Sequence, residues 1–241
     1  MRATTICCSL AMTFCMMAPA ADQRPARRPR DRKALPPDGP TSDYVRRELE
    51  GWTLRVHKGL LEKEHEELRA AAFRELEVQF YNIQRAVPAE AVARLKKVVI
   101  WLEHDNPKGR HAHYHPGVGW LKANGYNTDK VKCVEIGSAA NFLRAVRHQP
   151  WMVLHELSHA YHDQVLTWEH PKILAAYKDA SKSGKYEKVL IWNGRVGRHY
   201  AMTDHKEYFA ENTEAYFGTN DIYPFVRAEL KQHDPNMYAV L

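Results

Sequence analysis

Apolar residues recur at helical spacing over a long stretch in the first half of the chain. Residues 60–85 contain no glycine or proline, and positions three or four apart share one face: Leu61, His65, Leu68, Ala72, Leu76 and Phe80. This spacing predicts a long amphipathic helix. Residues 88–96 predict a shorter helix, because proline is tolerated in a first turn and the alanine-rich run after Pro88 favours helix.

Two short runs of apolar, β-branched residues follow. Residues 98–102 and 131–136 have the length and composition of buried strands. Between them, residues 104–127 are rich in glycine, proline, asparagine and histidine, which predicts a long loop. Loops of this length inside a compact domain are usually functional or disordered.

The second half of the chain predicts helices and one hairpin. The predicted helices cover residues 150–166, 173–179, 204–218 and a last segment that begins at Pro224. Asn193-Gly194 lies between two strand-like runs, 186–192 and 195–201, and is the strongest short-range hairpin signal in the chain. Asp204 can cap a helix that ends at Gly218. Since no internal repeat is present, the pattern predicts one α+β domain.

The N-terminal segment has the composition of an export signal. Arg2 precedes an apolar run, and Ala18-Pro19-Ala20 offers the small residues that a signal peptidase requires. We therefore expect residues 1–20 to be a cleaved signal peptide and the protein to be secreted or periplasmic. The alternative is a single anchor helix. No later segment approaches the roughly 20 apolar residues of a membrane-spanning helix, so we expect no stable membrane span.

Arginine and proline dominate the next segment. The chain carries a formal charge of +6, and much of this excess lies in residues 21–43, where repeated proline and low hydrophobicity predict a disordered basic linker. The alternative is a cationic patch for anionic polymers or nucleic acid. Because no aromatic residues interleave with the arginines, we expect no specific nucleic-acid partner. The folded domain is then residues 44–241, which retain a single cysteine, Cys133, and rely on a hydrophobic core without a disulfide.

The strongest chemical signal is His155-Glu156-Leu157-Ser158-His159. Two histidines four residues apart project from the same face of a helix and can both reach one metal ion. The pattern is typical of zinc metallopeptidases, in which the histidines are ligands and the glutamate is the general base. We therefore predict that His155 and His159 bind Zn²⁺ and that Glu156 is catalytic.

A catalytic zinc site needs a third protein ligand. His162 lies about a turn beyond the metal, so we expect it to pack or to line the rim of the cleft. The helix at 204–218 instead places Glu207, Glu211 and Glu214 on one face. Burying such a stripe is costly unless a cation compensates, so this helix can supply the ligand. The alternative is a solvated acidic face.

The segment from Tyr200 to Glu211, following a His-Glu-x-x-His helix, resembles the catalytic domains of the anthrax lethal factor family of zincin-fold metallopeptidases. The resemblance covers about residues 98–218, and its specific core is the two short motifs. It implies a small mixed sheet packed on the zinc-binding helix and on a second, glutamate-bearing helix. The middle of the zinc motif and the segment between the helices depart from the family, and toxin-delivery domains are lacking. The resemblance therefore supports a zinc peptidase and says nothing for a toxin.

The resemblance also assigns roles within the second motif. It implies that Glu207 completes the zinc ligands and that Glu211 is an outer-shell partner that orients a ligand histidine. Tyr200 falls on the family's tyrosine, which implies a catalytic role in stabilising the oxyanion; the alternative is an ordinary hairpin aromatic. Two roles remain open for Glu214: an outer-shell contact to a ligand, or a salt bridge.

Two further features bear on the substrate. The resemblance implies that the strand at 131–136 is an edge strand that binds an extended peptide. The histidines at 111, 113 and 115 alternate, which could bind a second metal, but cleft-lining histidines are commoner and no acidic residue is interleaved. The leading hypothesis is an exported zinc endopeptidase with a peptide or protein substrate. The alternatives are a non-catalytic zinc-binding or peptide-binding protein of the same architecture, and hydrolysis of a non-peptide amide.

Overall fold

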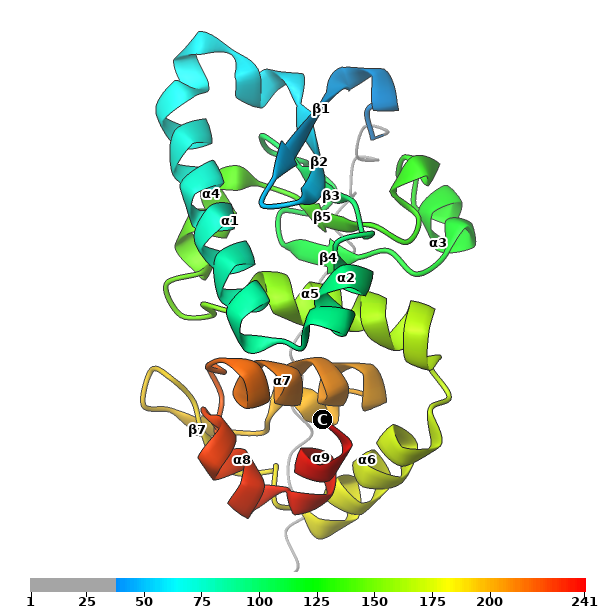
Figure 1. Cartoon of the computed structure of the whole chain (residues 1–241), viewed down its shortest axis with the longest axis vertical. Coiled ribbons are helices and arrows are strands. Elements are labelled where there is room, and N and C mark those ends of the chain that lie inside the picture. The colour runs from blue at the N-terminus through cyan, green and yellow to red at the C-terminus, as the bar shows by residue number, and fades with distance from the viewer. Residues whose placement is uncertain (1–37) are drawn as a thin grey trace, which may run out of the picture. The chain divides into compact units, whose positions relative to one another are not determined.

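The described part of the chain, residues 38–241 of a computed structural model, is built around a mixed five-stranded sheet with strand order β1-β2-β3-β5-β4 (Figure 1). Its strands are β1 (Tyr44–Leu49), β2 (Trp52–His57), β3 (Ile100–Leu102), β4 (Ala112–Tyr114) and β5 (Val134–Ile136). Strands β2, β3 and β5 are parallel, and the two edge strands, β1 and β4, are antiparallel to their neighbours. A small mixed sheet combined with many helices agrees with the predicted α+β class.

Helices make up most of the remaining structure. The α-helices are α1 (Glu66–Ala86), α2 (Ala89–Leu95), α3 (Val118–Ala123), α4 (Ala139–Ala145), α5 (Met152–Tyr161), α6 (Pro171–Ser183), α7 (His205–Phe217), α8 (Arg227–His233) and α9 (Pro235–Val240). The short 3-10 segments are Thr41–Asp43, Lys58–Leu61, Lys63–His65, Thr128–Lys130 and Tyr200–Met202, and a π-helical turn covers His162–Leu166. Strands β6 (Val189–Leu190) and β7 (Val196–Gly197) form the hairpin predicted around Asn193-Gly194.

The main hydrophobic core lies between one face of the sheet and helices α1 and α5. Alternate residues of β3 face this core, so Ile100 and Leu102 pack with the apolar stripe of α1. Phe80 of α1 stacks on Trp52 of β2 with ring centroids 4.4 Å apart. The core therefore fixes α5, the helix that carries the His-Glu-x-x-His motif, against the sheet.

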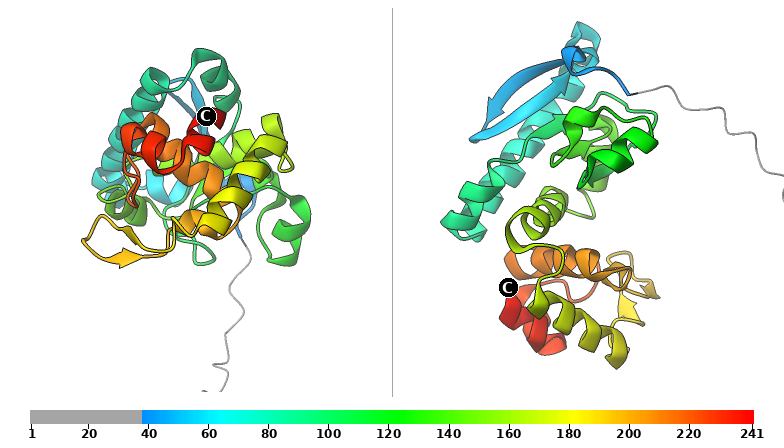
Figure 2. Two further views of the ribbon diagram at one scale, coloured as in Figure 1. Left: turned by 90° about the horizontal axis from the view of Figure 1, so that it is seen from below. Right: turned by 90° about the vertical axis from the view of Figure 1, so that its right-hand side faces the viewer.

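A second apolar cluster joins helices α6, α7 and α9 to the turn before α7. Figures 1 and 2 show α7 lying between α5 on one side and α6, α8 and α9 on the other. As a result, a continuous run of α7, from Tyr208 to Ala215, is buried. The predicted acidic stripe is thus not a solvated face: Glu211 and Glu214 are only 2% and 0% exposed.

The opposite face of the sheet carries a buried ionic cluster. The ammonium group of Lys130, which is fully buried, lies 2.7 Å from Asp38, 2.8 Å from Glu103 and 2.6 Å from Glu135. Burial by itself disfavours the carboxylate of Glu135, but the hydrogen bond with His115 and the charge of Lys130 outweigh it and lower the pKa of Glu135. Because His115 directly follows β4, this cluster ties the edge strand to the rest of the sheet.

Several predicted boundaries are wrong. The expected loop at 104–127 contains strand β4 and helix α3, and pairing of β4 with β5 makes β5 an internal strand instead of the predicted edge. The linker does not extend to residue 43, because Asp38 pairs with buried Lys130 and a 3-10 turn covers Thr41–Asp43. The first long helix begins at Glu66 and not at residue 60, and the last predicted helix is two helices, α8 and α9.

The predicted signal peptide, residues 1–20, and the linker up to residue 37 lie outside the described residues. Within residues 38–241, no helix combines the length and the apolar character needed to cross a membrane.

Candidate metal centre

Helices α5 and α7 bring three potential ligands to one point. The Nε2 atoms of His155 and His159 both face the same oxygen, Oε2 of Glu207, at 3.1 Å and 3.4 Å. One ligand atom from each of the three residues lies within 4.8 Å of the others. The Oδ1 atom of Asp204 accepts hydrogen bonds from the backbone N–H groups of Lys206 and Glu207, so the cap fixes the helical turn that carries this carboxylate.

The second ring nitrogen of His155 is held by Glu214. Its Nδ1 lies 2.7 Å from Oε1 of Glu214, which also accepts a hydrogen bond from the side chain of Gln149 at 3.1 Å. An N–H at Nδ1 leaves the lone pair of Nε2 directed toward Glu207, as a metal ligand requires. Glu211, which was expected to orient the histidine, lies farther from Nδ1, at 3.7 Å, so the direct hydrogen bond is made by Glu214.

The electrostatics of this cluster favour a cation. Burial disfavours a charged imidazole, but hydrogen bonds with Glu207 and Glu214 outweigh it and raise the pKa of His155 well above its usual value. Burial, together with the charge of Glu214, raises the pKa of Glu211 to about 8. The excess of carboxylates that favours a proton on His155 equally favours a dication in its place. The donor set therefore fits a divalent metal ion.

Glu156 is held by the edge strand. The backbone N–H of Tyr114 in β4 donates a 2.8 Å hydrogen bond to Oε2 of Glu156, and the Tyr114 hydroxyl donates to Asp163 at 2.6 Å. Asp163 lies in the π-helical turn after α5, so Tyr114 joins β4 both to the helix and to this turn. This arrangement fixes the carboxylate of Glu156 beside the candidate ligands.

The candidate ligands line a cavity of about 610 Å³. It runs between β4 and α7, and its walls include His155, Glu156, His159, Glu207, Glu211, Tyr200, Asp221 and residues 111–114. Tyr200 is half exposed in the 3-10 turn before α7, where its hydroxyl is available to a bound molecule. Burial and the nearby charge of Glu207 raise the pKa of Tyr200, so its hydroxyl remains a proton donor at neutral pH.

No protein-family model, curated protein or solved structure matches this chain. The role of the site is therefore argued from its own geometry.

The three alternating histidines do not form a second metal site within residues 38–241. None of the convergent groups of potential ligands there includes His111, His113 or His115. His115 is instead buried and lies 2.7 Å from Glu135 in the Lys130 cluster. His111 and His113 instead line the wall of the cavity that also holds the candidate ligands.

Sequence reasoning left the role of Glu214 open, and it missed the contact between Tyr114 and Glu156. The spacing of Glu207 and Glu214, seven residues apart, does place both on one face of α7. It was the antiparallel crossing of α5 and α7, visible only in three dimensions, that brought Glu214 to Nδ1 of His155.

His162 is excluded from the centre, as the sequence predicted. Its ring is fully buried against Trp168 and Phe209, and neither nitrogen has a hydrogen-bond partner within the described structure. Burial, with a smaller contribution from His205, lowers the pKa of His162 to about 3. The ring therefore stays neutral in the folded protein.

This environment makes the stability contribution of His162 dependent on pH. The pKa of His162 is lower in the folded state than the value of 6.5 in the unfolded state. As the pH falls below 6.5, the unfolded state therefore takes up a proton before the folded state does, and the folded protein loses stability. We expect His162→Leu to stay within about 1 kcal/mol of wild type at pH 7.5 and to be about 1–2 kcal/mol more stable than wild type at pH 5. Urea unfolding at both pH values, with chelator present, measures this difference; an equal difference at both would contradict it.

Proposed function

We propose that this protein is a zinc-dependent metallopeptidase of the zincin type, which hydrolyses peptide bonds with Glu156 as the general base. The observation that carries the proposal is the convergence of His155, His159 and Glu207 in a cavity that Glu156 also lines. Two imidazole nitrogens and one carboxylate oxygen are a ligand set of catalytic zinc sites, which leave a coordination position open for water. Zinc bound there would supply an activated water and polarise the substrate carbonyl.

The other residues of the cavity suit hydrolysis. The carboxylate of Glu156 accepts the proton of the attacking water and can deliver it to the leaving amine. The N–H of Tyr114 engages Oε2 of Glu156, and no donor from residues 38–241 engages Oε1, which can take part in this transfer. The half-exposed hydroxyl of Tyr200 can donate a hydrogen bond to the oxyanion, which is charged only in the transition state.

The edge strand favours a peptide over other amides. Strand β4 pairs with β5 on one side only, and residues 111–114 line the cavity on the other. An extended peptide can add to such an edge through main-chain hydrogen bonds. The substrate-binding role first assigned to residues 131–136 therefore passes to β4, since β5 has neighbours on both sides.

The proposal is tested with purified protein that has been loaded with zinc and assayed on a diverse peptide library. We expect about one zinc ion per chain, cleavage that stops with chelator, and recovery on addition of zinc. Stoichiometric zinc without cleavage of any peptide would refute a peptidase and favour a zinc-binding or peptide-binding protein. If the protein cleaves a non-peptide amide but no peptide, its function is hydrolysis of non-peptide amides.

Replacing Glu207 by alanine tests the third ligand. We expect zinc affinity to fall by about a hundredfold or more, since one of three protein ligands is removed. The variant should still fold. Competition with a chromophoric chelator measures the affinity. Glu77→Ala, on the exposed face of α1, is the matched control and should bind zinc as wild type does. Unchanged affinity of Glu207→Ala would refute the assignment.

A further inference from the structure

A second cavity of about 330 Å³ adjoins the first at the N-terminal end of β4. The two cavities share His111, Ala112, Gln149 and Glu156 as wall residues, so they are neighbouring parts of one cleft. Helix α4 and the segment that follows it supply the far wall of the second cavity. A molecule that reaches Glu156 along β4 can therefore extend into this second cavity.

The charges of the two cavities differ. Among the described residues, Glu156 lines both cavities, and three further carboxylates, Glu207, Glu211 and Asp221, line the first alone. The second is lined by Arg144, His148 and Asn141, which the first lacks, and by His111, which the two cavities share. Of the described residues that line the cleft, the carboxylates other than Glu156 therefore lie in the first cavity, and the arginine lies in the second.

Arg144 has no acidic partner within residues 38–241. Its guanidinium group donates to the side-chain oxygen of Asn141, three residues earlier on α4, and forms no ion pair there. A guanidinium has five N–H donors arranged as a fork that matches a carboxylate. Arg144 therefore presents unused donors at the wall of the cavity.

We propose that the second cavity is a subsite for a carboxylate of the substrate, bound chiefly by Arg144; this rests on the proposed peptidase function. The carboxylate belongs either to an aspartate or glutamate side chain or to the C-terminus of the peptide. Arg144 supplies the charge and a bidentate hydrogen bond, and His148 adds a further donor when it is protonated.

His148 is held at the rim of this subsite by the β6–β7 hairpin. Its ring stacks on Trp192, with centroids 5.0 Å apart and an angle of 16° between the ring planes. This contact joins the segment before α5 to the loop of the hairpin. The ring of His148 thereby has a defined position from which its NMR signals report occupation of the subsite.

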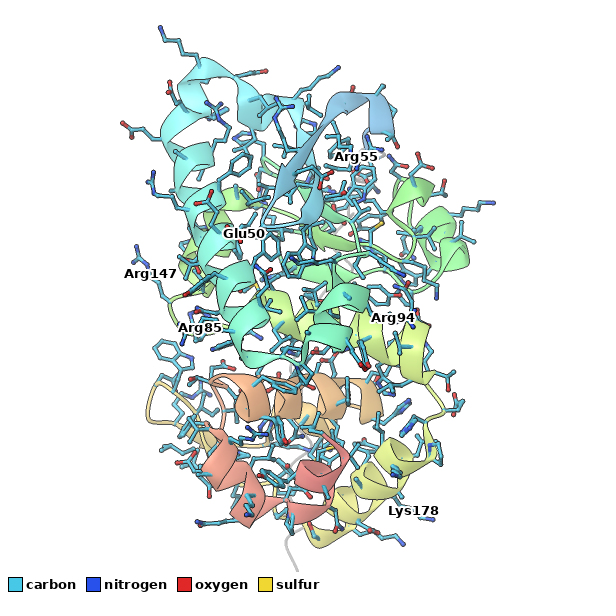
Figure 3. All side chains as sticks on the ribbon, in the orientation of Figure 1. Glu50, Arg55, Arg85, Arg94, Arg147 and Lys178 are labelled. Carbon is cyan, nitrogen blue, oxygen red and sulfur yellow. The ribbon has the colours of Figure 1, made fainter. Side chains whose placement is uncertain are left out.

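Arg147 provides a matched control. It is exposed and follows Arg144 by three residues, but it does not line the cavity, and Figure 3 shows its side chain extending away from the body of the protein. Arg147→Gln and Arg144→Gln remove the same charge from the same short segment. Only Arg144→Gln should change carboxylate binding.

The test uses four acetylated alanine pentapeptides, with a central Glu or Gln and with a free or amidated C-terminus. Binding to the zinc-loaded protein is followed through the NMR signals of His148 and its neighbours. In wild type and Arg147→Gln, we expect peptides with the favoured carboxylate to bind about tenfold more tightly than the amidated Gln peptide. In Arg144→Gln this preference should disappear. The amidated Glu peptide and the free-acid Gln peptide distinguish a side-chain carboxylate from a terminal one.

Equal binding of all four peptides to wild type, or a preference that survives in Arg144→Gln, would overturn the subsite. The same peptides are also assayed for cleavage, which separates the two proposals. Carboxylate-selective binding without cleavage of these or any other peptides would refute the peptidase and leave the subsite. Cleavage with no carboxylate preference would refute the subsite and leave the peptidase.

Discussion

Replacing Glu156 by glutamine is expected to lower the rate of peptide hydrolysis about a thousandfold while the fold and zinc content remain unchanged. Glutamine has nearly the same shape and can still accept the hydrogen bond from the N–H of Tyr114, so β4 and α5 should keep their positions. It cannot accept the proton of the attacking water. The loss should therefore appear in kcat, with little change in KM.

Glu169→Gln is the control for this experiment. Glu169 is exposed after the end of α5 and takes no part in the cavity, so its variant should hydrolyse peptides as wild type does. Zinc content and circular dichroism of both variants establish that the fold is intact. A zinc-loaded Glu156→Gln with wild-type turnover would remove Glu156 from the mechanism.

Replacing Lys130 by methionine is expected to destabilise the folded protein by about 3–5 kcal/mol at pH 7. Methionine fills similar space but leaves the buried carboxylates of Asp38, Glu103 and Glu135 without their cation. Burial raises the pKa of Glu103 to about 7 even with Lys130 present, so this carboxylate can offset part of the loss by taking up a proton, whereas Asp38 and Glu135 remain without their cation. Urea unfolding at pH 7 measures the change.

The pH dependence of this loss has a definite sign. In wild type, despite burial, the pKa of Lys130 is raised above 10.5 in the folded state by the charges of Glu135 and Glu103, which stabilises the protein at all pH values below 10.5. The pKa of Glu135 is lowered in the folded state, which adds stability that is lost as the pH falls below 4.5. In the variant the carboxylates should take up protons more readily. The deficit should thus be largest between about pH 5 and pH 10 and should shrink in acid.

Lys132→Met is the matched control for Lys130→Met. Lys132 pairs with Asp163, but its side chain is 45% exposed. Although the side chain of Asp163 is only 9% exposed, it keeps the hydrogen bond from the Tyr114 hydroxyl, and the lost ammonium group lies in contact with water, so this variant should lose about 1 kcal/mol or less. Equal losses in the two variants would show that burial of Lys130 is not the cause.

Local patterns predicted the elements whose signals are contained within a few neighbouring residues. The cap at Asp204, the stop at Gly218 and the Asn193-Gly194 turn all formed as expected, because each depends on backbone geometry within one turn. Strand β4 and the β1–β2 hairpin went unpredicted. The three residues of β4 form a strand because they pair with β5, and a sequence signal for so short a strand is absent.

By itself the sequence determined the composition of the candidate centre: His155, Glu156 and His159 share a helix, and their spacing alone sets which side chains face the same way. The tertiary structure decided what faces them. Packing of α7 between two apolar clusters buried its carboxylates and brought Glu207 between the histidines and Glu214 behind His155. Pairing of β4 with β5 placed the N–H of Tyr114 on Glu156. These contacts join residues 42 to 59 positions apart, and they depend on the packing of whole helices and strands, which local spacing does not specify.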